Sequence, residues 1–224
     1  RSSMDSRVLT RGALHLARAR LRRERIAPLP EELRPRDETQ AYAMQDEVHN
    51  ILAQSNWGAV AGYKIGCTTA VMQRFLNIPN PCAGGVFART AFQEDALVRY
   101  ADYVRVGVEC EIAVRLGADL EPQGSAFTSE SVAPAVQACM AAIEIVDDRY
   151  DDYRRFDTPT LIADDFFDAG CVLGAPVTDW RRFDLRGLSG STLIDGNEVG
   201  RGKSADVMGH PFAALAWLAN SMAE

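Results

Sequence analysis

An alternating segment at residues 106–116 (VGVECEIAVRL) constrains the fold more than any other part of the chain. Apolar residues occupy every second position from Val106 to Leu116, and Glu109 and Glu111 fall between them. This period of two predicts a β-strand with both carboxylates on one face, about 7 Å apart by the strand rise. Two carboxylates so placed could bind one hard cation. The alternative is a half-buried strand whose outer face is simply wet.

A third acid, Glu144, stands in the apolar segment 140–146 (MAAIEIV). A carboxylate among apolar neighbours is costly to bury alone, so it needs a metal, a cation or strong hydrogen-bond donors. An ion pair with an arginine would satisfy a single buried acid. Three acids on two apolar strands instead favour a metal site.

Length, charge and composition limit the class of protein. The 224 residues are most simply one domain, with a helical subregion at 1–58 and a β-rich region at 59–224. The net charge of −7 argues against nucleic-acid binding. No apolar run approaches the roughly 18–20 residues of a membrane span. Five scattered cysteines indicate free thiols in a reducing cytoplasm.

The order of elements indicates an α+β fold, because two helices precede irregular β structure with single helices. An arginine-rich first helix can also be an organelle transit peptide, but this pattern continues into a second helix capped by Asp37. The helical pattern has no C-cap signal at the end of the chain, so we expect an incomplete C-terminus. We expect helices at 6–25, 37–54, 69–76, 131–140 and from 209–212 onward, strands at 59–66, 86–87, 106–116, 140–146 and 169–174, and a hairpin at 193–199 that turns at 195–196.

Three further motifs bear on the chemistry. Lys64 lies between apolar residues, where its ammonium either reaches water or acts, partly desolvated, on a substrate carboxylate or a proton. Residues 200–204 (GRGKS) are not a phosphate-binding loop, because the motif's first glycine is replaced by Asn197. His210 precedes a helix-opening proline and is expected to cap that helix, and no Gly-x-Ser-x-Gly elbow supports a serine hydrolase.

Several short motifs occur in a fixed order, and together they resemble one known family. The resemblance is to the 2-keto-4-pentenoate hydratase branch of the fumarylacetoacetate hydrolase superfamily, and it extends over nearly the whole chain. The motifs are residues 62–68 (GYKIGCT), 108–113 (VECEIA), 142–147 (AIEIVD), 161–164 (LIAD) and 205–211 (ADVMGHP).

The resemblance implies a fold of mixed, curled β-sheets around a central metal site. We therefore expect a β-roll or barrel with an N-terminal helical pair and peripheral helices, assembled into homo-oligomers. The resemblance also implies that Glu109, Glu111 and Glu144 are the ligands of Mg²⁺ or Mn²⁺.

The resemblance assigns the remaining site residues as well. Lys64 corresponds to the family's catalytic, substrate-binding lysine, and Asp164 to the aspartate of a loop that closes over the substrate. Phe87 is a further candidate substrate contact. The chain departs from the family at residues 81–84 (PCAG), where an acidic residue usually precedes the glycine. It departs again at 163–167 (ADDFF), where the usual loop is Ala-Asp-Asn-Ala-Ser.

The resemblance implies a function, and the departures bear on the pocket. Asp165 and Phe167 are expected to change the charge and the volume of the pocket. The expected activity is metal-dependent hydration of a 2-hydroxy-dienoate, a small 2-oxo acid, in the catabolism of aromatic or related compounds. A chelating metal would stabilise the enolate that such chemistry requires. The alternatives are a decarboxylase or C–C hydrolase of similar 2-oxo acids, and a catalytically silent, ligand-binding homologue.

Overall fold

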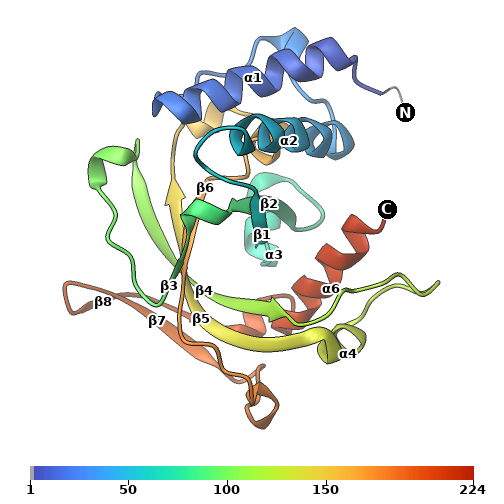
Figure 1. Cartoon of the computed structure of the whole chain (residues 1–224), viewed down its shortest axis with the longest axis vertical. Coiled ribbons are helices and arrows are strands. Elements are labelled where there is room, and N and C mark those ends of the chain that lie inside the picture. Colours follow the sequence, from blue (N-terminus) through green and yellow to red (C-terminus); the bar gives the residue numbers. More distant parts are fainter. Residues whose placement is uncertain (1–2) are drawn as a thin grey trace.

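The computed structural model describes residues 3–224, and its helices pack around a curled sheet (Figure 1). The two N-terminal helices pack together at one end of the molecule, and the C-terminal helix lies beside the long central strands. Within the described residues, no helix combines the length and the apolar character needed to cross a membrane. The helices are α1 (Ser6–Arg22), α2 (Glu38–Ala53), α3 (Ala70–Leu76), α4 (Ser129–Val132), α5 (Thr158–Ala163) and α6 (Pro211–Met222).

The strands form one four-stranded sheet and two antiparallel pairs. The sheet has the order β3-β6-β5-β4, in which only β3 and β6 run parallel; β1 pairs with β2, and β7 with β8. Among residues 3–224 these sheets do not close, so the expected roll or barrel is not confirmed. The strands are β1 (Val60–Gly66), β2 (Cys82–Phe87), β3 (Ala91–Gln93), β4 (Val106–Leu116), β5 (Val136–Asp147), β6 (Asp168–Leu173), β7 (Ser189–Ile194) and β8 (Asn197–Lys203).

Most predicted elements are confirmed, because local signals define their ends. The Asp37 carboxylate accepts from the Gln40 N–H at 2.9 Å and begins α2. The β7–β8 hairpin turns at Asp195, which has a positive φ, and at the following glycine. His210 caps α6, since its Nδ1 accepts from the backbone N–H two residues on at 2.9 Å. The short strand expected at 86–87 begins earlier, at Cys82.

The helix predicted at 131–140 is wrong. Only α4 and a short 3₁₀ turn are helical there, and β5 already begins at Val136. Alanine-rich segments have high helix propensity. Pairing along the neighbouring strand overrides it here, since Ala138 pairs with Arg115 and Met140 with Ala113. Tertiary pairing therefore decides the conformation of this segment.

The main hydrophobic core joins the N-terminal helices to the β1–β2 pair and α5. Leu16, Met44, Phe87 and Leu161 are each no more than 2% exposed and belong to this one cluster. It includes residues from both expected subregions, and a boundary at residue 58 stays a prediction. A second cluster packs α6 against β5 through Trp180 and its neighbours.

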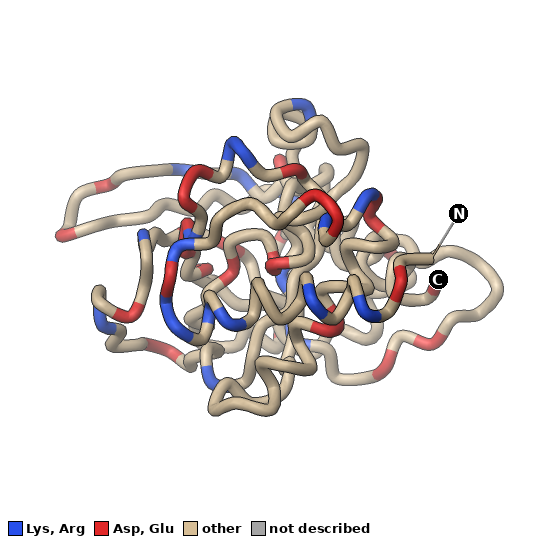
Figure 2. Tube along the Cα trace, turned by 90° about the horizontal axis from the view of Figure 1, so that it is seen from above, with Lys and Arg blue, Asp and Glu red and all other residues tan. Residues whose placement is uncertain are grey.

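Charged residues of both signs are interspersed along the trace in the view of Figure 2. Several form exposed ion pairs, such as Arg201 with Glu198 at 2.7 Å. Exposed pairs of this kind contribute at most about 1 kcal/mol to stability. Charges buried in the interior, in contrast, must be paired, and they gather around the turn that follows α5.

Candidate metal and substrate site

Strands β4 and β5 bring the three predicted glutamates together. Glu109 stands directly opposite Glu144 in the antiparallel register, and Glu111 lies two residues further along the same face. One carboxylate oxygen from each lies within 4.8 Å of the others. All three line a cleft of about 1140 Å³, hereafter the acidic cleft. Glu109 itself is exposed, so the wet outer face weighed as an alternative stays open, and the role of the three glutamates as metal ligands stays a prediction.

Lys64 extends from β1 into the acidic cleft. Its Nζ donates to Glu144 Oε2 at 3.1 Å and to the carbonyl of Phe166 at 2.7 Å. Desolvation lowers the pKa of Lys64, but the negative charges of Glu144 and Asp168 outweigh it and raise that pKa above its ordinary value. Lys64 is therefore a fixed cation in the cleft.

The carboxylates of the cleft repel one another. Burial, followed by the charges of Glu144 and Glu109, raises the pKa of Glu111 to about 7. Burial and Glu144 likewise raise the pKa of Glu109. Oxygen donors with such an excess of negative charge suit a hard divalent cation, so this residue set fits Mg²⁺ or Mn²⁺.

Asp168, at the start of β6, was not found from the sequence. Asp168 is 2% exposed and lines the cleft, and among residues 3–224 its Oδ2 has no hydrogen-bond partner. Burial, together with Glu144, raises its pKa well above the ordinary value. The available signal was an acid placed directly before the apolar segment 169–174.

The turn after α5 has an uncommon backbone. Asp165, Phe166 and Phe167 have φ values of 61°, 48° and 68°, a left-handed region that residues other than glycine rarely adopt. Hydrogen bonds hold it, including one from the Phe166 N–H to the Leu161 carbonyl at 2.8 Å. This turn presents the Phe166 carbonyl to Lys64 and places both phenylalanines on the cleft wall.

Asp164 lies in a buried ionic cluster and does not line the acidic cleft. Its Oδ2 accepts from Arg149 Nε at 3.1 Å and from the Tyr150 hydroxyl at 2.7 Å. Arg20 Nη1 lies 3.6 Å from its other oxygen. The structure thus gives Asp164 neighbours that are protein groups, and its contact with substrate stays a prediction.

Asp165 belongs to the same buried cluster. Its Oδ1 accepts from His49 Nε2 at 2.6 Å and from the Gly85 N–H at 2.8 Å, while Oδ2 accepts from Arg20 at 2.8 Å. Desolvation raises the pKa of Asp165, but His49 and Arg20 outweigh it and lower that pKa to about 2. The expectation that Asp165 changes the charge of the pocket is wrong, because its charge is paired in the core. Phe167 does line the cleft.

Phe87 is packed in the core. It is 1% exposed, and its ring meets those of His49 and Trp57 edge-on at 5.5 and 5.4 Å between centroids. The residues that line the acidic cleft do not include it. A substrate contact through Phe87 stays a prediction.

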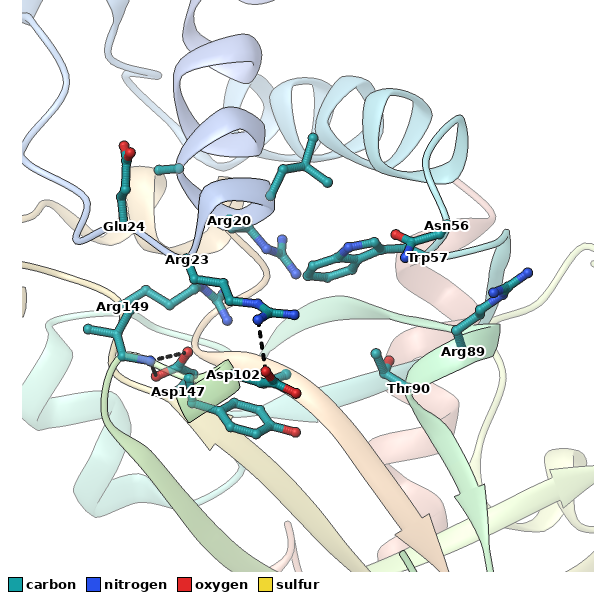
Figure 3. Close-up of a pocket in the computed structure, with 15 residues that line it drawn as sticks. Arg20, Arg23, Glu24, Asn56, Trp57, Arg89, Thr90, Asp102, Asp147 and Arg149 are labelled. Atoms are coloured by element: carbon teal, nitrogen blue, oxygen red, sulfur yellow. Dashed lines mark hydrogen bonds and ion pairs between the residues drawn. The ribbon is translucent and has the colours of Figure 1, made fainter. Parts of the chain in front are cut away.

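A second, smaller cavity of about 360 Å³ lies beside the C-terminal end of α1 (Figure 3). Arg23 and Asp102 form an ion pair across it at 2.8 Å, and Arg20 and Trp57 also line it. It contains none of the three glutamates. The three predicted ligands therefore line the acidic cleft and not this second cavity.

Comparisons with known proteins agree with these observations. Residues 79–223 match the family model described as fumarylacetoacetate (FAA) hydrolase C-terminal. The chain is 36% identical over 222 residues to a 2-keto-4-pentenoate hydratase of Paraburkholderia phymatum, covering 98% of this chain and 82% of the relative. It is 32% identical over 173 residues to a 2-hydroxyhexa-2,4-dienoate hydratase of Comamonas testosteroni, covering 76% of this chain and 64% of the relative.

Solved structures share the fold. The 4-oxalocrotonate decarboxylase from Pseudomonas putida G7, complexed with magnesium and adipate, matches with a TM-score of 0.90 at 24% identity. The match covers 100% of this chain and 83% of that one. At 24% identity, this match shows that the two chains share the arrangement of helices and sheets.

Proposed function

Because the chain belongs to the fumarylacetoacetate hydrolase family, in its 2-keto-4-pentenoate hydratase branch, we propose that it is a divalent-metal-dependent hydratase. It adds water to a 2-hydroxy-dienoate, or the corresponding 2-oxo-enoate, in the catabolism of aromatic or related compounds. Two relatives with hydratase names, each at least 32% identical, support this substrate class.

The main observation in support of this proposal is the group of three carboxylates beside Lys64. Glu109, Glu111 and Glu144 offer oxygen atoms within 4.8 Å of one another. Mg²⁺ or Mn²⁺ held by them would supply Lewis-acid stabilisation of the enolate of a 2-oxo acid. Oxygen ligands suit both ions. The fold relatives complexed with magnesium or with calcium support a hard divalent cation.

Lys64 acts as a fixed charge in this proposal. Its ammonium attracts the substrate carboxylate. The Phe166 carbonyl and Glu144 together hold its Nζ in place. Neutralising the substrate carboxylate lowers the energy of an adjacent enolate.

The turn after α5 positions the cleft wall. Phe166 and Phe167 form an apolar surface for the hydrocarbon part of the dienoate and limit water around it. We propose that Asp164 stabilises this turn. Its contacts with Arg149 and Tyr150 hold the backbone that carries the Phe166 carbonyl. This makes Asp164 a positioning residue for Lys64.

We also propose a homo-oligomer that works in a reducing cytoplasm. Leu193, Ile194 and Val199 on the β7–β8 hairpin are 59%, 49% and 58% exposed, which supports burial against a second copy. The five cysteines are all free, which supports a reducing compartment. Light scattering coupled to size exclusion checks the assembly, and a monomer would contradict it.

Turnover of a 2-hydroxy-dienoate with Mg²⁺, with Mn²⁺ and with a chelator tests the function. We expect loss of the dienoate absorbance and formation of the 4-hydroxy-2-oxo acid only when a metal is present. Release of CO₂ from an unsaturated 2-oxo dicarboxylate, without hydration, would instead assign a decarboxylase. Metal binding without turnover of any 2-oxo acid would indicate the silent homologue.

A further inference from the structure

Two buried cysteines meet at the wall of the acidic cleft. The Sγ atoms of Cys67 and Cys82 lie 3.7 Å apart. The strand register explains this approach, because Gly66 pairs with Cys82 across β1 and β2, and Cys67 is the next residue. A disulfide needs sulfurs about 2.05 Å apart, so these two must approach by roughly 1.7 Å.

The two thiols are not equivalent. Cys67 is 8% exposed and lines the acidic cleft, whereas Cys82 is fully buried. The Cys82 thiol donates its hydrogen to Cys67 Sγ. This hydrogen bond, with help from the charge of Lys64, lowers the pKa of Cys67, and the same contact raises the pKa of Cys82. Cys67 is therefore the more reactive thiol and the one that a solute in the cleft can reach.

The chain between the two cysteines forms part of the cleft wall. It contains α3, which has no buried residue. Met72 and Phe75 of α3 line the cleft and are 41% and 67% exposed. The helix is tied to Cys67 by a hydrogen bond from Gln73 Nε2 to the Cys67 carbonyl at 2.9 Å.

From this geometry we propose that Cys67 and Cys82 are a dithiol switch, which a peroxide oxidises to a disulfide that fixes α3 on the cleft. The Cys67 thiolate attacks the peroxide, breaks its O–O bond and becomes a sulfenic acid, releasing one water after protonation. Cys82 then attacks that sulfur, forms the S–S bond and releases a second water. Two thiols and one hydrogen peroxide thus give one disulfide and two waters.

The disulfide restrains the segment that it encloses. A cross-link across this short loop removes backbone freedom, chiefly at the base of α3. Reduction by a dithiol reverses the change. The switch acts on the mobility of the cleft wall and requires no change at Glu109, Glu111 or Glu144.

Peptide mapping of the full chain tests the proposal. The reduced protein is treated with hydrogen peroxide, its remaining thiols are alkylated, and peptides are analysed by mass spectrometry. We expect a Cys67–Cys82 cross-linked peptide that dithiothreitol abolishes, and trypsin cleavage after the exposed Arg74 slowed several-fold in the oxidised protein. In Cys82→Ser, Cys67 stops at a sulfenic acid that dimedone traps, while the control Cys139→Ser still forms the cross-link.

Two results would overturn the switch. One is that Cys67 and Cys82 stay alkylatable at a peroxide dose that oxidises the exposed Cys110. The other is a cross-link that leaves cleavage at Arg74 unchanged. If Cys82→Ser does not fold, peptide mapping of the parent chain still shows whether the Cys67–Cys82 cross-link forms. Neither readout involves turnover, so failure here leaves the proposed hydratase activity untouched.

Discussion

At the scale of single residues, the proposed mechanism depends on individual charges in the acidic cleft, and Lys64 is the first to test. Replacing it with methionine keeps the stem and removes the cation that pairs with Glu144 at 3.1 Å. We expect kcat for dienoate hydration to fall by about 100-fold or more. We expect Mg²⁺ affinity to be kept, because the carboxylates are unchanged. Steady-state kinetics and calorimetric Mg²⁺ titration measure both quantities.

Lys203→Met is the matched control for that substitution. Lys203 lies on the exposed hairpin strand β8, outside the acidic cleft. Its replacement should leave kcat and Mg²⁺ affinity at the parent values. A Lys64→Met enzyme with parental kcat would show that the lysine is not needed for catalysis.

The buried carboxylate of Asp165 makes the stability of the fold depend on pH in the acid range. Its pKa of about 2 is depressed from 3.8, so the unfolded chain binds the proton more readily. The stabilisation, about 2 kcal/mol, is therefore present above pH 3.8 and is lost as the pH falls toward 2. Asp165→Asn should remove it and should also turn an amide N–H toward Arg20.

Urea unfolding at neutral pH and in this acid range measures the prediction for Asp165. We expect Asp165→Asn to lose about 2–4 kcal/mol at neutral pH and to show a weaker decline on acidification. Asp195→Asn, in an exposed hairpin turn with positive φ, is the control and should be neutral. Equal stability of the Asp165 variant and the parent would refute the role of the buried cluster.

At the scale of elements, strand β2 packs directly on the turn that follows α5. A Cβ at Gly84 would lie 2.8 Å from the Asp165 carbonyl oxygen, and that neighbour is backbone. Gly84→Ala should therefore destabilise the fold by about 1–3 kcal/mol through overpacking. Gly62→Ala on the paired strand β1 is the matched control, since nothing lies within 4 Å of the position that a Cβ would take there. Thermal unfolding compares the two, and equal melting temperatures would contradict the close packing.

Elements with local signals could be predicted from the sequence. Strand β4 was predicted from end to end, because apolar residues occupy every second position along its whole length. Helix α2 and the β7–β8 hairpin were predicted because their cap and turn residues act within a few positions. Glu144 was recognised because a charge in an apolar run needs a partner.

The rest depends on contacts that the sequence pattern does not contain. The left-handed turn at Asp165 is held by groups far away in the chain, such as Arg20 and His49. The orientation of that turn decides that Asp164 enters the buried cluster and that Asp168 enters the cleft. The start of β5 was missed because strand pairing overrode helix propensity.

At the scale of the whole molecule, the site exists only in the folded chain. Lys64 comes from β1, Glu109 from β4, Glu144 from β5 and Asp168 from β6. In the proposed enzyme, a divalent ion would therefore bind the native state far better than the unfolded state and stabilise it by mass action, about 2.7 kcal/mol at a hundredfold excess over Kd. The melting temperature should rise with Mg²⁺ concentration.

Mg²⁺ affinity of the Glu109→Gln variant tests the central claim most directly. The raised pKa of Glu109 reflects an unfavourable charge, so this variant should stay folded without metal while losing a ligand. Isothermal titration should give one ion per parent chain and an affinity at least about tenfold weaker in Glu109→Gln. Glu198→Gln on the exposed hairpin should bind as the parent does. A Glu109→Gln chain that bound Mg²⁺ as tightly as the parent would contradict the metal site.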